Sequence, residues 1–116
     1  VAVSGSYAYV IGGDSDSLAV LDVSDPAAPT IVGSVTDDPN DSRMRRPVDV
    51  AVSGSYAYVT GRDTDSLVVL DVSDPADPEI VGSVSNSSVM NEPLGVAVSG
   101  LYAYVTGRDT DSLVVL

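Results

Sequence analysis

The chain has 116 residues, enough for one small domain, and 17 acidic against 5 basic residues give it a formal net charge of −12. A field this negative repels phosphate backbones, which argues against nucleic-acid binding. There is no cysteine, which excludes disulfides and thiol chemistry. No apolar run approaches the ~20 residues of a membrane-spanning helix, so membrane insertion is not expected.

One segment occurs three times along the chain. Val1–Leu21 is the first copy, and Val50–Leu70 and Val96–Leu116 repeat it at spacings of 49 and 46 residues. The last two copies differ only at Ser55 and Leu101. Such self-similarity is typical of an architecture in which one supersecondary unit stacks on its neighbours.

Each repeat is predicted to form four short strands, which in the second repeat are Val48–Val52, Tyr56–Thr60, Ser66–Val72 and Glu79–Val84. Turns rich in Gly, Pro, Asp and Ser separate them, which favours an antiparallel all-β fold. The second and third strands are almost continuously apolar, which implies burial on both faces. A four-stranded meander of this kind describes one blade of a β-propeller, so we expect propeller blades. A β-sandwich is the alternative.

About two and two-thirds blades are expected: residues 1–47, residues 48–93, and a partial third blade at 94–116. Closed propellers need at least four blades. Three explanations stay open. The chain is part of a longer propeller, it closes by assembling with other copies, or it adopts a different fold. An open stack would leave an unpaired strand edge at Leu113–Leu116.

Two motifs recur within the repeats. The residues that carry them are Ala51–Val59 (AVSGSYAYV), Leu70–Pro75 (LDVSDP), Pro78 and Ile80–Gly82 (IVG), with counterparts between Ala2 and Gly33. This pattern resembles the LVIVP repeat, a β-propeller repeat of secreted and surface proteins of bacteria and archaea. The resemblance implies a propeller fold, an extracellular or cell-surface location and no shared catalytic residue. The chain departs from it in two longer loops, Thr36–Arg46 and Ser85–Glu92.

An Asp-x-Asp-Ser loop follows the second strand of every repeat. Two carboxylates at i and i+2 could begin a calcium site, because calcium takes six to eight oxygen ligands. The alternative is a solvated hairpin in which Asp and Ser bond turn amides. The candidate calcium ligands are Asp14, Asp16, Asp63, Asp65, Asp109 and Asp111. No other cofactor is expected.

No catalytic residue is predicted. The motif Asp-Val-Ser-Asp-Pro, at Asp22–Pro26 and Asp71–Pro75, fits a turn in which Asp and Ser bond backbone amides and Pro presets φ. Its carboxylates recur from blade to blade, whereas a catalytic site normally breaks the symmetry.

The two long loops are expected on the same rim as the Asp-rich loops, which makes this rim a candidate surface for a protein or glycan ligand. The candidate interaction residues are Arg43, Met44, Arg45, Arg46, Met90 and Asn91. The arginines either pair locally with Asp37, Asp38 and Asp41 or dock on an Asp-rich loop of another blade or chain. The methionines are expected to pin the loops to the blades.

Each long loop also contains an N-glycosylation acceptor pattern, at Asn40 and at Asn86. The chain is therefore predicted to be a non-enzymatic structural or interaction scaffold of a secreted or cell-surface protein, self-assembling into a ring or filament. Its expected partners are other copies of itself or further blades. The alternative is a module that binds calcium, a glycan or a protein on the rim.

Overall fold

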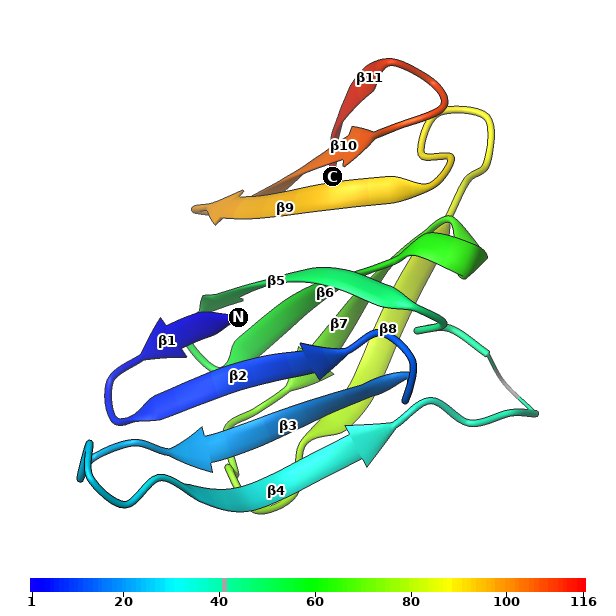
Figure 1. The fold of residues 1–116 in the computed structure, drawn as a ribbon. Helices are drawn as coiled ribbons and strands as arrows, with labels where there is room; N and C mark the ends of the chain where they lie inside the picture. Colours follow the sequence, from blue (N-terminus) through cyan, green and yellow to red (C-terminus); the bar gives the residue numbers. More distant parts are fainter. Residues whose placement is uncertain (41) are drawn as a thin grey trace.

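The computed structural model describes residues 1–40 and 42–116 and forms three antiparallel sheets that stack on one another (Figure 1). The first sheet contains β1 (Ala2–Ser4), β2 (Tyr7–Gly12), β3 (Ser17–Asp22) and β4 (Thr30–Thr36). The second contains β5 (Pro47–Ser53), β6 (Tyr56–Gly61), β7 (Ser66–Asp71) and β8 (Glu79–Ser85). The third contains β9 (Pro93–Ser99), β10 (Tyr102–Gly107) and β11 (Ser112–Val115). Strands pair in chain order within each sheet.

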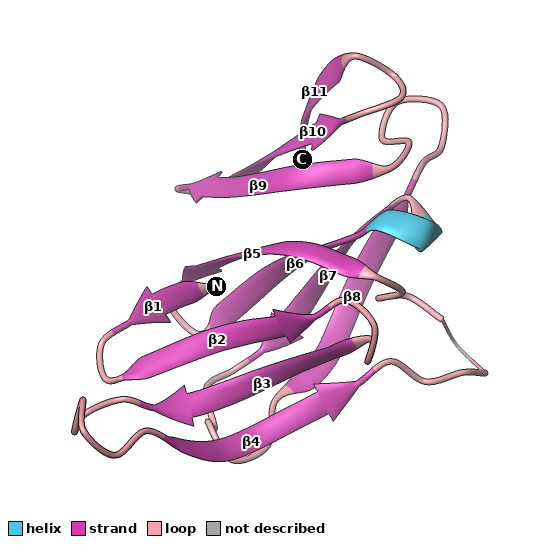
Figure 2. Cartoon of the chain, viewed as in Figure 1, coloured by secondary structure: helices cyan, strands magenta, loops and turns pink. Residues whose placement is uncertain are grey.

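These three sheets are propeller blades, which confirms the predicted fold class. The predicted strands of the second repeat agree with β5 to β8 to within two residues. A single 3-10 turn, η1 (Arg62–Thr64), interrupts the strands and loops of the described residues (Figure 2). Nothing in these residues forms a helix with the length and hydropathy that a membrane crossing requires.

The second sheet is covered on both faces, as the continuous apolar runs predict. On one face, Val59 and Leu70 join the larger core cluster with residues of the first sheet. On the other face, Leu67 and the half-buried Tyr58 join a smaller cluster with Val105 of the third sheet. Side chains alternate between the two faces of a strand, so each face of the middle sheet supports one neighbour.

Tight turns join the first two strands of each blade at equivalent glycines. Gly5, Gly54 and Gly100 each have a φ of 58°, a left-handed conformation that glycine adopts without steric cost. At the opposite end lie the Asp-rich loops and the two long inter-repeat loops, and this end forms the rim described next.

Candidate interaction surfaces

The inter-repeat loops lie on the same rim as the Asp-rich loops, as the blade topology predicts. The Asp37 amide donates to the Asp16 carbonyl (2.8 Å), and the Asn86 amide donates to the Asp65 carbonyl (3.1 Å). The Arg62 amide donates to the Arg46 carbonyl (3.1 Å). Each long loop therefore passes between the Asp-rich loops of two consecutive blades.

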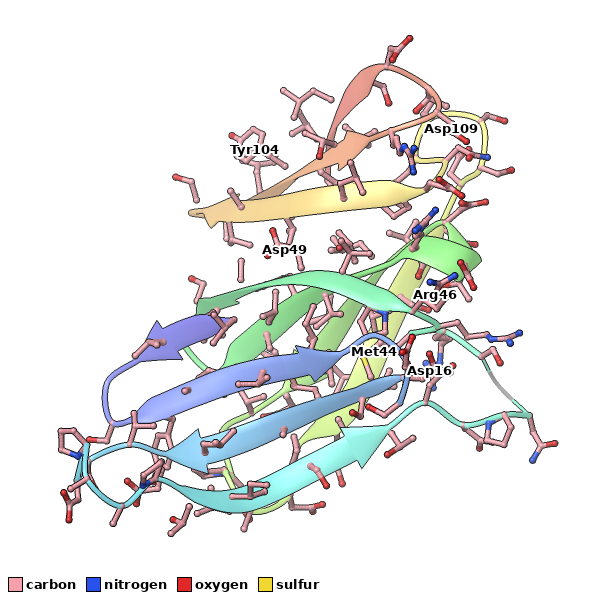
Figure 3. All side chains as sticks on the ribbon, viewed as in Figure 1. Asp16, Met44, Arg46, Asp49, Tyr104 and Asp109 are labelled. Atoms are coloured by element: carbon pink, nitrogen blue, oxygen red, sulfur yellow. The ribbon has the colours of Figure 1, made fainter. Side chains whose placement is uncertain are left out.

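Asp16 and Asp65 hold the following blade through their side chains. The Asp16 carboxylate accepts the Arg46 amide (2.8 Å), and the Asp65 carboxylate accepts the Glu92 amide (2.9 Å). Both aspartates have positive φ, 51° and 48°, which Asp tolerates better than most residues. We call these two contacts the aspartate latches. Figure 3 shows Asp16 beside Arg46 at the edge of the rim.

Pairs of hydroxyl groups anchor the other side of each long loop. Thr64 Oγ1 and Ser66 Oγ donate to the Arg43 carbonyl at 3.1 and 2.8 Å. In the third blade, Thr110 and Ser112 donate to the Val89 carbonyl at 3.1 and 2.5 Å. The Ser and Thr of these Asp-x-Asp-Ser loops therefore bind carbonyls of the adjacent long loop, and not the amides of their own turn that the hairpin alternative predicted.

Met44 and Met90 are buried between blades and are not exposed on the rim for contact with a partner. Their exposed fractions are 0% and 1%, and each lies in the core cluster between two blades. A flexible thioether fills irregular gaps well. The prediction that they pin the loops is confirmed, and their assignment as partner-contact residues is wrong, because burial leaves no surface to offer.

The arginines meet the Asp-rich loops through their backbone. The Arg46 amide donates to Asp16, and the Arg45 carbonyl accepts from the Asp63 amide (3.3 Å). Asp37 accepts the Arg43 and Met44 amides at 2.9 and 3.0 Å, which closes the loop. Asp41 lies outside the described residues. Among the described residues of this rim, Glu92 also forms ion pairs with Arg62 (3.3 Å) and with Arg108 (3.4 Å).

The six candidate calcium ligands stay in three separate loops. The described residues contain no group of three or more acidic, His or Cys side chains placed to hold a metal. Asp16 and Asp65 each commit one carboxylate oxygen to a latch. Calcium binding at these loops stays a prediction without support from the geometry.

The remaining rim candidates are accessible. Asn40 and Asn86 are exposed, and Asn91 is half-buried beside Glu92. The Asn86 side chain accepts the Ser88 amide (3.0 Å). Glycosylation at the two sites stays a prediction.

Asp49 of β5 joins two blades, a role that the sequence analysis did not assign to it. Its carboxylate accepts the Val96 amide of β9 (3.0 Å), joining the second and third blades (Figure 3). Thr60, fully buried, accepts the Asp49 amide (3.1 Å) and donates to the Leu94 carbonyl (3.2 Å). Gly95 replaces Asp49 in the next repeat, and this difference was the available signal.

The Asp-Val-Ser-Asp-Pro motif forms the turn that its composition predicts. Asp71 Oδ1 accepts the Ser73 amide (2.8 Å) and the Ser73 hydroxyl (2.6 Å). The hydroxyl bond, followed by the amide bond, holds the pKa of Asp71 below its ordinary value. Asp22 and Ser24 repeat the arrangement, with the same lowering of the pKa of Asp22.

The two outer faces of the stack expose apolar side chains that are buried inside it. On the third blade Leu113 is 65% exposed, whereas its counterparts Leu18 and Leu67 are 0% and 3% exposed. On the first blade Ile31 is 71% exposed, whereas its counterpart Ile80 packs against the core. We call these surfaces the end faces. The face of the third blade includes Leu113, Val115 and the outward-pointing Tyr104 (Figure 3), and that of the first includes Val1, Val3, Val10 and Ile31.

Stacked antiparallel meanders of four, four and three strands define a repeat protein of the β-propeller class. The family model of the LVIVD repeat matches residues 1–37, 45–86 and 94–116. The chain belongs to the LVIVD repeat family, which confirms the resemblance seen in the sequence and corrects the name of the repeat from LVIVP to LVIVD. Leu67–Asp71 reads LVVLD here.

No curated protein matches the chain. Among solved structures, it is similar to a functionally unknown protein from Desulfotomaculum acetoxidans DSM 771, with a TM-score of 0.73 and 14% identity over 96% of this chain. The match covers 37% of that protein, so the chain spans little more than a third of its length. This likeness shows the fold.

Proposed function

We propose that the chain is a non-enzymatic scaffold of an extracellular or cell-surface protein, in which blades associate through the end faces. The exposed face of the third blade carries the observation on which this proposal depends. It repeats the leucine, valine and tyrosine pattern that the first blade buries against the second as Leu18, Val20 and Tyr9. Contiguous exposed apolar patches of this kind mark interaction sites.

The two end faces are complementary. Within the chain, the face that contains Leu18 or Leu67 packs on the opposite face of the next blade, which contains Ala57 or Ala103. The first blade exposes the latter type of face, around Val10 and Ile31. Copies that join the third blade of one to the first blade of the next form a head-to-tail contact, which generates a ring or a filament.

The test is the mass of the particle in solution, measured by light scattering over a concentration and salt series. The mass is expected to rise with concentration, and with salt, because copies of charge −12 repel at low ionic strength. Leu113→Asp and Ile31→Asp should each keep the chain monomeric. Val81→Asp, at an exposed valine of β8, is the control that should assemble normally.

A monomer at every concentration and salt condition would refute assembly through the end faces. So would assembly of both Asp variants at the wild-type mass, because a charge within either apolar face cannot be buried unpaired.

A further inference from the structure

Two positions of the repeat change their charge from one junction between blades to the next. Arg46 and Glu92 each end a long loop, directly before a proline, and we call their place the bridging position. Gly13, Arg62 and Arg108 open the Asp-rich loops of the three blades, and we call their place the flanking position. Figure 3 shows Arg46 on the rim.

The backbone shows that Arg46 and Glu92 are equivalent. Their φ angles are 46° and 44°. The latch aspartate of the preceding blade accepts the amide of each. The carbonyl of each accepts the amide of the flanking residue of the next blade, at 3.1 Å from Arg62 and at 3.3 Å from Arg108. A residue at the bridging position therefore contacts two consecutive blades through its backbone.

The charges are arranged in opposite ways at the two junctions. Between the second and third blades, the Glu92 carboxylate forms ion pairs with both flanking arginines, Arg62 (3.3 Å) and Arg108 (3.4 Å). Between the first and second blades, Arg46 takes the place of Glu92, and Gly13 takes the place of the arginine on the preceding blade. An arginine at position 13 would therefore bring three arginines together around the first junction.

The described backbone does not require glycine at position 13. A Cβ built there meets one atom within 4 Å, the Pro47 carbonyl oxygen at 3.5 Å, which is an ordinary contact distance. Gly13 is not among the glycines with positive φ. Arg62 and Arg108 also show that the same loop accepts an arginine. The remaining reason for a neutral residue is electrostatic, because like charges placed side by side repel.

We propose that the charges at the bridging and flanking positions specify which blades can lie side by side, among repeats that are otherwise nearly identical. A second blade that followed the second blade of another copy would place Arg46 between two copies of Arg62. A third blade that followed a first blade would leave Glu92 facing Gly13, with one ion pair in place of two. The two junctions of the chain avoid both arrangements. Repulsion in wrong pairs contributes to specificity as attraction in correct pairs does, and repeat proteins are prone to misassembly.

The first test is a double-mutant cycle in urea unfolding. It uses the Ile31→Asp chain, in which end-face association is blocked, so that its result does not depend on the proposed self-association. Gly13→Arg should raise the equilibrium constant of unfolding about two- to fivefold beside Arg46. In the Arg46→Glu chain it should lower this constant by a similar factor, because the new carboxylate would join two arginines as Glu92 does. Gly13→Gln, the uncharged control, should have the same effect in both chains. The reversal should fade at about 1 M salt, where the Debye length is about 3 Å.

The second test measures blade pairing itself, as the mass distribution by light scattering after the same chain is refolded at high concentration. Arg46→Glu should raise the fraction above the monomer mass about twofold or more, because second blades of two copies could then pair without repulsion. Arg46→Lys keeps the positive charge and should match the parent. Three results would each overturn the proposal. They are an equal effect of Gly13→Arg in both chains, a reversal that persists unchanged at about 1 M salt, and equal refolded masses for Arg46→Glu and the parent.

Discussion

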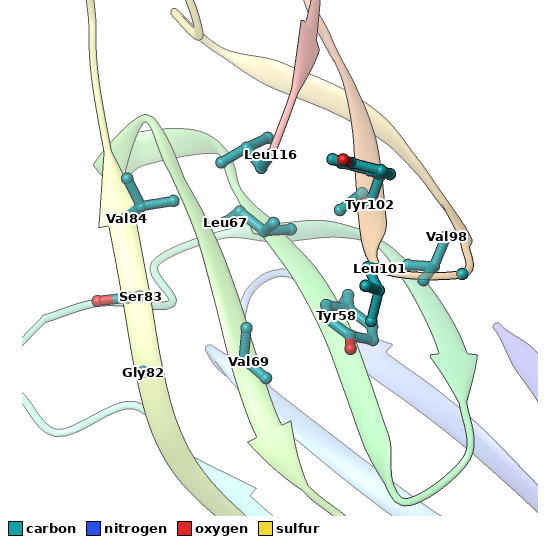
Figure 4. Close-up of a pocket in the computed structure, with 12 residues that line it drawn as sticks. Tyr58, Leu67, Val69, Gly82, Ser83, Val84, Val98, Leu101, Tyr102 and Leu116 are labelled. Atoms are coloured by element: carbon teal, nitrogen blue, oxygen red, sulfur yellow. The ribbon is translucent and has the colours of Figure 1, made fainter.

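The two interfaces between consecutive blades use nearly the same residues, but only the first is filled. The interface between the second and third blades contains a groove of about 440 Å³, which lies between β6 to β8 and the turn that joins β9 to β10 (Figure 4). In the first interface Tyr9 is 5% exposed, and burial raises the pKa of its phenol. Its counterpart Tyr58 is only half-buried and lines the groove. A blade therefore does not close its interface by its first three strands alone. The fourth strand and its turn complete it.

The largest expected difference in the free energy of unfolding is between substitutions of a buried leucine and of its exposed counterpart. Leu18→Ala should lower the free energy of unfolding by about 2–5 kcal/mol, because it opens a cavity in the filled interface. Leu113→Ala, on the end face, should change it by less than about 0.5 kcal/mol in dilute monomer. Urea unfolding measures both. Equal losses would mean that the end face is covered in solution.

The second comparison uses the two glycines on the fourth strands. Gly33→Val should destabilise by about 1–3 kcal/mol, because the new side chain collides with the Pro75 carbonyl. Gly82→Val should leave the free energy of unfolding, measured by thermal unfolding, within about 0.5 kcal/mol of the parent value. A large loss in the Gly82 variant would show that the groove is closed in the free chain.

The third comparison tests the aspartate latches. Asp65→Ala removes the acceptor of the Glu92 amide and should cost about 1–3 kcal/mol. Asp111→Ala is the control, because Asp111 has nearly the same φ, 47° against 48°, and accepts no amide from the described residues. The difference between the two variants in denaturant unfolding isolates the latch from the backbone strain. Identical losses would assign the whole effect to the left-handed backbone.

The smallest expected effect concerns the pKa of Asp71, in the turn between β7 and β8. Asp71 has a lowered pKa, so its contribution to stability is present above the ordinary carboxyl pKa and is lost as the pH falls through the lowered value. Ser73→Ala should return the pKa of Asp71 toward its ordinary value by removing the hydroxyl donor. Carboxyl ¹³C NMR titration measures this. Asp22, which pairs with Ser24, should keep its lowered pKa in the same variant.

Short-range features could be predicted from the sequence. The turn at Asp71–Pro75 depends on contacts between residues two apart, and the apolar run of β7 indicates burial on both faces. The shared rim follows from the topology of a meander. The replacement of Asp49 by Gly95 in the next repeat marks Asp49 but not its partner, because the Val96 amide is 47 residues away and nothing in either local pattern pairs them. The contact of the Arg46 amide with the Asp16 carboxylate could not be predicted either, because it depends on how the long loop closes over Met44.

The repeat, its strands and its turns could be predicted from the sequence alone, because short apolar runs and turn chemistry act over a few residues. Only the tertiary structure decided what each copy of a residue does. Leu18, Leu67 and Leu113 stand in the same local motif, and yet two are buried and one is exposed. Burial depends on which blade lies against the face, and that neighbour is specified by position in the stack rather than by the motif.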